Sequence, residues 1–135
     1  MPTHTAVSTE AHARLARATR SHAEALAELA QVVPGLETRG FAHAIRRLLD
    51  GKNGPGFVPD AYQVDRDHRT LRLWEIELHH PIPDAKMDRI AWLWFLLDCE
   101  EWALELYRTT PGLVPMDPVD LMSHYHRMAR CSTTA

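Results

Sequence analysis

The sequence predicts an α/β domain in which a small mixed β-sheet is flanked by helices. Three observations support this fold class. Apolar residues recur with helical spacing near both ends, two strand-like runs surround a short polar stretch, and an apolar helix with a further strand-like run follows them. A chain of 135 residues lies in the single-domain range. We therefore expect one domain over 1–135, with an N-terminal helix at 8–33, a core at 36–109 and a C-terminal helix at 116–130.

Two helices are expected before the sheet. In 8–33, apolar residues are spaced three or four apart, as on one face of a helix, and Pro34-Gly35 ends the pattern. A second helix is expected over 38–50, with Gly51 as its stop. Glycines, a proline and an asparagine in 51–56 then predict a loop.

A β-hairpin is expected next, because 57–64 and 70–79 are rich in β-branched, aromatic and leucine residues and only a short polar stretch separates them. A helix over 85–101 should follow with Asp84 as its cap, and its apolar run predicts burial against the sheet. Another strand is expected at 102–109. Asp117-Pro118 is expected to cap the final helix.

Composition narrows the function classes. The formal charge is −3, which argues against a polybasic coat protein, and the 45% hydrophobic content is that of a globular chain. A count of two cysteines argues against a disulfide framework and against a zinc cluster. No secretory leader and no apolar run of membrane-spanning length are visible, so we expect a cytoplasmic protein without a membrane partner.

The expected hairpin also fixes a register. If Arg66–Arg69 form the loop, Val64 faces Leu71 and Tyr62 faces Leu73. Extending the same register places Asp60 opposite Glu75, and strand alternation puts Glu77 on the face of Glu75. Three carboxylates would then lie on one face of the hairpin.

Such a group predicts a site for a hard divalent cation. Close carboxylates repel one another unless a cation or proton neutralises them, and Mg²⁺ prefers oxygen ligands. We expect Mg²⁺ there, with Mn²⁺ as a substitute. The alternative is a solvated outer strand face. The apolar residues on the same face favour the metal site.

These residues resemble the PD-(D/E)XK nuclease superfamily. Pro59-Asp60 is followed on the second strand by Glu75-Ile76-Glu77, and a helix and a strand come next. The resemblance covers about 36–109 and implies a restriction-endonuclease-like core that acts on DNA phosphodiester bonds. By position, it implies that Asp60, Glu75 and the backbone carbonyl of Ile76 bind the metal.

The chain departs from the usual motif at Glu77, which occupies the position of the family's lysine. Some restriction endonucleases resemble it there, which implies that Glu77 binds metal or accepts a proton from water. In other members the lysine lies on the following helix, and Lys86 occupies that position here. A third reading is that the fold remains without catalysis. The catalytic residues implied are Asp60, Glu75, Glu77 and Lys86.

Basic residues near this region are candidate phosphate contacts, namely Lys52, Arg46 and Arg47. The function that the sequence favours is a Mg²⁺-dependent nuclease-like protein acting on DNA, with a metal-dependent hydrolase activity. The rival is a catalytically inactive nuclease-fold module, such as a phage-encoded regulator, that contacts protein or DNA. A homodimer or another protein partner is compatible with either function. A purely structural α/β domain is the remaining alternative.

Overall fold

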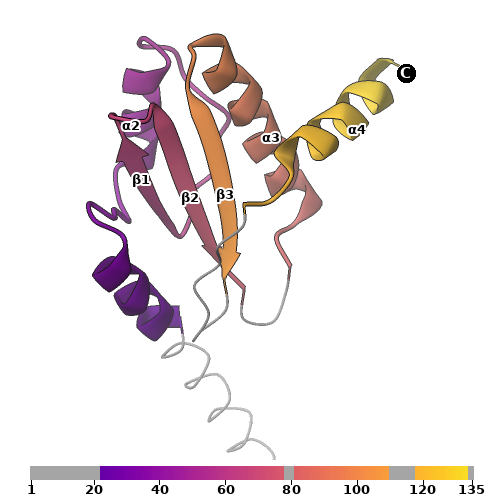
Figure 1. Ribbon diagram of the computed structural model, residues 1–135. Helices are drawn as coiled ribbons and strands as arrows, with labels where there is room; N and C mark the ends of the chain where they lie inside the picture. Colours follow the sequence, from indigo (N-terminus) through magenta and orange to yellow (C-terminus); the bar gives the residue numbers. More distant parts are fainter. Residues whose placement is uncertain (1–21, 78–80, 110–117, 134–135) are drawn as a thin grey trace, which may run out of the picture.

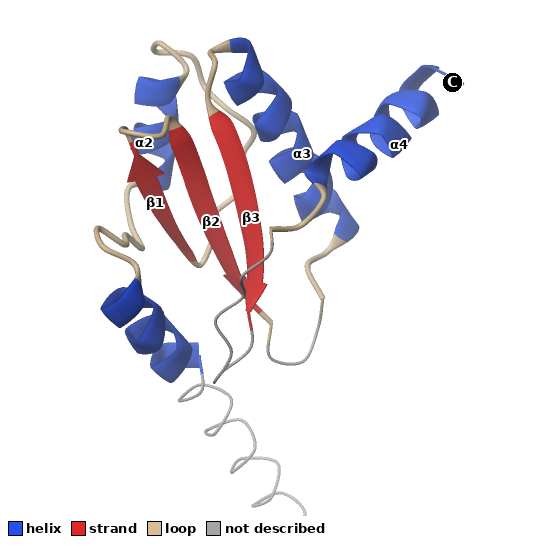
Figure 2. Cartoon of the chain, viewed as in Figure 1, coloured by secondary structure: helices blue, strands red, loops and turns tan. Residues whose placement is uncertain are grey.

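The computed structural model describes residues 22–77, 81–109 and 118–133. Its labelled elements run α2 (Phe41–Leu48), β1 (Ala61–Asp65), β2 (Thr70–Ile76), α3 (Asp84–Cys99), β3 (Ala103–Thr109) and α4 (Leu121–Thr133). A helical segment at 22–32 precedes them. Figure 2 shows the three strands as one sheet with helices around it, which confirms the α/β class.

The sheet is mixed, as expected, with strand order β1-β2-β3. Strand β1 pairs antiparallel with β2, and β2 pairs parallel with β3. Helix α3 makes the crossover between the two parallel strands, as such a connection requires (Figure 1). The predicted register is confirmed, because Tyr62 pairs with Leu73 and Val64 with Leu71.

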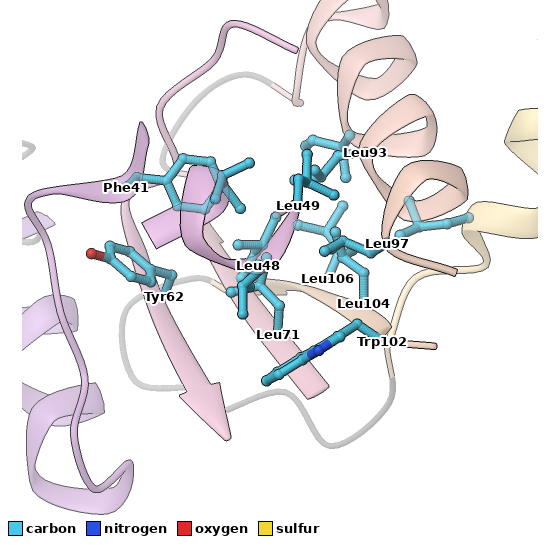
Figure 3. Packing of buried hydrophobic residues seen from close by; sticks show 14 residues of the cluster. Phe41, Leu48, Leu49, Tyr62, Leu71, Leu93, Leu97, Trp102, Leu104 and Leu106 are labelled. Carbon is cyan, nitrogen blue, oxygen red and sulfur yellow. The ribbon is translucent and has the colours of Figure 1, made fainter. Parts of the chain in front are cut away.

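The main core lies between the sheet and helices α2 and α3. Leu71, Leu73 and Leu106 face Leu93 and Leu97 there, and all five side chains are fully buried. Figure 3 shows α3 placing its leucines over those of the strands. The predicted burial of the apolar helix is therefore confirmed on one face.

The other faces of α3 are covered less completely. Trp92 is 44% exposed and stacks on Phe95, whose ring lies 5.2 Å from that of Tyr125 on α4. Helix α4 thus packs mainly on an aromatic side of α3, and its Leu121 joins the main core. Within the apolar run 90–97 the exposed residue is Trp92, and the exposed Asp98 and Cys99 follow the run.

A smaller cluster covers the opposite face of the sheet. Leu29, from the helical segment at 22–32, packs with Ala61 and Trp74. The part of the predicted N-terminal helix that the structure describes is therefore helical and packed, whereas 8–21 lies outside the described residues.

Several predicted boundaries were wrong. Helix α2 begins at Phe41 and not at 38, because Glu37 forms a bridge with Tyr62 and Gly40 has a left-handed backbone, with φ of 75°. Strand β1 begins at Ala61 and not at 57, because Pro59 directly before Asp60 has no N–H to donate. Asp60 therefore lies just before the strand.

The predicted caps also need correction. Asp84 is the first residue of α3 and makes no side-chain cap, since Pro83 occupies the N-cap position. At α4 the cap is Asp120, whose Oδ1 accepts the Ser123 N–H at 3.1 Å. The predicted cap Asp117 lies outside the described residues, as do His79 and His80 at the predicted end of β2.

No helix among the described residues is long and apolar enough to cross a membrane.

Candidate metal and phosphodiester site

The predicted acidic residues lie where the carboxyl end of β2 meets the chain entering β1. Glu75 is near the end of β2, on the face that also carries Leu71 and Leu73. Asp60 precedes β1, and its Oδ2 accepts the Ile76 backbone N–H at 2.7 Å. This bond replaces the ladder pair with Glu75 that the extended register predicted, because Asp60 is outside the strand.

Glu75 is a buried acid, with 7% of its side chain exposed. Lys86, in the first turn of α3, brings its Nζ to 2.5 Å from Glu75 Oε1. The Lys86 hydrogen bond with good geometry goes instead to the Val58 carbonyl at 2.8 Å. Within the described residues, Glu75 Oε1 is the one buried side-chain oxygen without a directed hydrogen bond. Its contact with Lys86 is therefore mainly one of charge.

The environment favours a proton on Glu75. Burial raises the pKa of Glu75 from 4.5 to about 7; the nearby Lys86 ammonium opposes this rise, and the Asp60 carboxylate adds to it. Asp60 Oδ2 accepts the N–H of Ile76, the residue after Glu75, so the two carboxylates lie at the same end of β2. Such a pair can bind a proton or a cation at neutral pH.

Glu77 has partners of its own. Its Oε1 accepts from Arg108 Nε at 2.7 Å and from the Ile82 N–H at 3.2 Å. Both bonds engage Oε1, so Arg108 and the backbone hold one oxygen of the Glu77 carboxylate beside the end of β2. Arg108 was missed by the sequence reasoning, because only the parallel register, which places it beside Glu75, reveals it.

A small pocket of about 120 Å³ opens beside these groups. It is lined by Glu75, Ile76, Glu77, Pro81, Ile82, Pro83 and Lys86. Asp60 does not line it. The pocket therefore joins most of the predicted site residues, and Asp60 reaches the site through its contacts with Glu75 and Ile76.

A further contact bears on Asp60. His22 Nε2 lies 3.4 Å from Asp60 Oδ1, so the helical segment at 22–32 reaches the site. With Oδ2 on the Ile76 N–H, Asp60 uses one oxygen for the backbone and leaves the other facing a titratable ring. Sequence spacing gave no indication of His22, because 38 residues separate it from Asp60.

No group of three or more His, Cys, Asp or Glu side chains arranged for a metal occurs in the described parts of the chain. Asp60, Glu75 and the Ile76 carbonyl would supply only two carboxylates, so they fall short of such a group. Mg²⁺ is often bound in proteins through one or two carboxylates. Glu75 Oε1 has a charge contact with Lys86 but no directed hydrogen bond, and a carboxylate oxygen of this kind is a suitable Mg²⁺ ligand. The three-carboxylate arrangement expected from the register is not formed.

The predicted nucleic-acid contacts lie elsewhere. Arg46 and Arg47 are exposed on α2 and Lys52 is exposed on the loop after it. Arg47 lines a hollow that lies against β1 and not at Glu75.

No protein-family model, curated protein or solved structure matches this chain.

Proposed function

We propose that the protein is a metal-dependent nuclease of the PD-(D/E)XK type that hydrolyses DNA phosphodiester bonds. The observation that carries the proposal is the environment of Glu75, a buried acid whose Oε1 has a charge contact with Lys86 and no directed hydrogen bond, beside the second carboxylate of Asp60. Protein interiors rarely leave a buried carboxyl oxygen without a directed hydrogen bond. A divalent cation between Asp60 and Glu75 would supply one.

The chain's own residues divide the work as follows. Asp60 and Glu75 hold Mg²⁺, with the Ile76 carbonyl as the backbone ligand that the resemblance implies. The Ile76 N–H keeps Asp60 in place. Mg²⁺ in such a site polarises a phosphate and lowers the pKa of an attacking water.

Lys86 supplies the positive charge that the motif usually carries on the second strand. Its Nζ is 2.5 Å from Glu75 Oε1 and is fixed by the Val58 carbonyl. An ammonium held there neutralises negative charge that develops on a phosphate near Glu75. Glu77, paired with Arg108, positions the end of β2 and is not a free base.

The rival function, a nuclease-fold module that binds without cleaving, also has an observation in its favour. The one acid that could replace the missing lysine on β2, Glu77, is already paired with Arg108 and the Ile82 N–H. Such a site would bind a cation or DNA without an activated water.

Calorimetry with Mn²⁺ and a plasmid-nicking assay with Mg²⁺ test the proposal together. Asp60→Asn and Glu75→Gln each remove one negative charge at nearly constant size, so Mn²⁺ affinity and nicking should both fall at least tenfold. Asp98→Asn, an exposed acid on α3, is the matched control and should leave both unchanged.

The outcomes separate the functions. Mn²⁺ binding that depends on Asp60 without any nicking selects the non-cleaving module. Wild-type protein that neither binds Mn²⁺ nor nicks plasmid refutes a metal site here.

A further inference from the structure

A hollow of about 400 Å³ lies between α2 and the edge strand β1. Figure 1 shows α2 beside β1, whereas α3 and α4 lie towards the β3 edge of the sheet. Four basic side chains contribute to its lining, Arg39, His43, Arg47 and Arg66. We call this surface the basic hollow.

Three separate segments build the basic hollow. His43 and Arg47 are one turn apart on α2, so they share a face of that helix. Arg39 lies just before α2, and Arg66 begins the turn after β1. Only the folded chain brings these positions together.

Tyr62 fixes the position of Arg39. Its hydroxyl donates to the Arg39 carbonyl at 2.5 Å. Burial and the neighbouring Glu37 raise the pKa of Tyr62 to about 12, so the hydroxyl stays protonated at neutral pH. Backbone bonds between Glu37 and Tyr62 close the same corner of the hollow, at 2.8 and 2.9 Å.

The arginines of the basic hollow make no ion pair with the part of the chain that the structure describes. Within the described residues, none of Arg39, Arg47 and Arg66 has an acidic side chain within ion-pair distance, whereas Arg72 and Arg108 do. Glu37 is the one acid in the lining, so the hollow carries excess positive charge. Exposed guanidinium groups that converge without partners repel one another, and their planar forks match the oxygens of a phosphate.

We propose that the basic hollow holds a backbone phosphate of the same nucleic acid whose scissile phosphate lies beside Glu75, an inference that rests on the proposed function. Asp60 directly precedes β1 and Arg66 directly follows it. The six residue steps from Asp60 to Arg66 span roughly 20 Å, which is about six base pairs of duplex DNA. Only a polynucleotide at least that long occupies the basic hollow and the Glu75 site together, whereas a small phosphodiester reaches the Glu75 site alone.

The binding test measures fluorescence anisotropy of a labelled DNA duplex several times longer than this span, with EDTA present so that no cleavage occurs. The double variant Arg47→Ala/Arg66→Ala should bind about tenfold more weakly, and its affinity should depend less steeply on salt, by about one in the log–log slope. Arg127→Ala on α4 removes an exposed charge far from the hollow and should bind like wild type.

A second variant guards against an effect on folding. Arg47→Lys/Arg66→Lys keeps both charges and should recover part of the affinity, although lysine lacks the bidentate fork. Equal duplex affinity of the alanine double variant and wild type overturns the proposal. So does a wild-type protein that does not bind the duplex.

Hydrolysis distinguishes this proposal from the proposed function. Bis(p-nitrophenyl) phosphate is too small to reach the hollow, so the alanine double variant should hydrolyse it at the wild-type rate while its cleavage of long DNA falls. An equal loss on both substrates overturns the separate phosphate site. If wild type hydrolyses neither substrate, the proposed function fails, and the anisotropy result still decides the hollow.

Discussion

Strand β2 carries charged side chains on both of its faces, and the two groups differ in how completely they are paired. On one face, Arg72 donates to Gln63, Asp65 and Glu105 at 2.8 to 2.9 Å, and we call these four residues the Arg72 cluster. On the other face lie Asp60, Glu75 and Lys86, the Glu75 cluster. The two clusters shift the pKa values of their acids in opposite directions.

The difference between the clusters appears in the pKa values of Asp65 and Glu75. The hydrogen bond from Arg72 lowers the pKa of Asp65 to about 2, with smaller help from His68. Burial raises the pKa of Glu75 to about 7. Arg72 satisfies its acids in a half-exposed setting, whereas Lys86 reaches a buried acid without a directed hydrogen bond. The Arg72 cluster therefore stabilises the fold, and the Glu75 cluster costs stability that ligand binding can recover.

The largest change in stability is expected from Glu75→Gln in the metal-free protein. The pKa of Glu75 is higher in the folded chain than its ordinary 4.5, so its contribution to stability is full below pH 4.5 and is lost as the pH rises through about 7. At full ionisation this difference is worth about 3 kcal/mol. Glutamine cannot ionise, so the variant should be about 1–3 kcal/mol more stable than wild type at pH 8.

Urea denaturation in EDTA across pH 4.5 to 8 measures this effect. Wild type should lose stability relative to Glu75→Gln over that window, and Mn²⁺ should restore stability to wild type only. If the free energies of unfolding of the two proteins change with pH in parallel, the Glu75 carboxyl is paired as completely as the acids of the Arg72 cluster.

The sequence predicted where the Glu75 cluster lies better than it predicted the contacts among the residues of that cluster. Strand alternation and a four-residue loop were enough for the register, because shifting it would have moved every leucine to the wrong face. The resemblance to the PD-(D/E)XK superfamily implied Lys86, because some members carry the lysine on the helix that follows the second strand. Asp60 was misplaced because the effect of Pro59 on the strand start was not taken into account.

The remaining contacts depend on tertiary structure. The partner of Glu77, Arg108, lies on β3, and its position follows from the parallel register between β2 and β3. The basic hollow requires the bridge between Glu37 and Tyr62, which shortened α2 and brought Arg39 beside β1. Neither the parallel register nor this bridge leaves a periodic pattern in the sequence.

Arg72→Met should lower the free energy of unfolding, whereas Glu75→Gln should raise it, and the effect of Arg72→Met should be smaller. It leaves Asp65 and Glu105 partly buried, with side chains 19% and 32% exposed, and without their shared cation. Solvent screens part of this loss, so the variant should be destabilised by about 1–2 kcal/mol at pH 7. Urea denaturation checks this, and Arg46→Met, an exposed charge on α2, is the control that should match wild type. A stabilised Arg72→Met would place the Arg72 cluster in the same class as the Glu75 cluster.

The smallest effect is expected from His68→Ala, although His68 Nδ1 lies 2.8 Å from Asp65 Oδ2. The imidazole is 75% exposed, and an exposed ion pair contributes little because water and salt screen it. Asp65 keeps its bond from Arg72, the larger cause of its low pKa, so the stability that depends on ionised Asp65 should still be present above pH 3.8 and be lost as the pH falls towards 2. Acid denaturation followed by circular dichroism should give His68→Ala and wild type the same midpoint. A midpoint moved to higher pH in His68→Ala would mean that Arg72 alone does not hold Asp65, and the pairing that separates the two clusters would then depend on an exposed histidine.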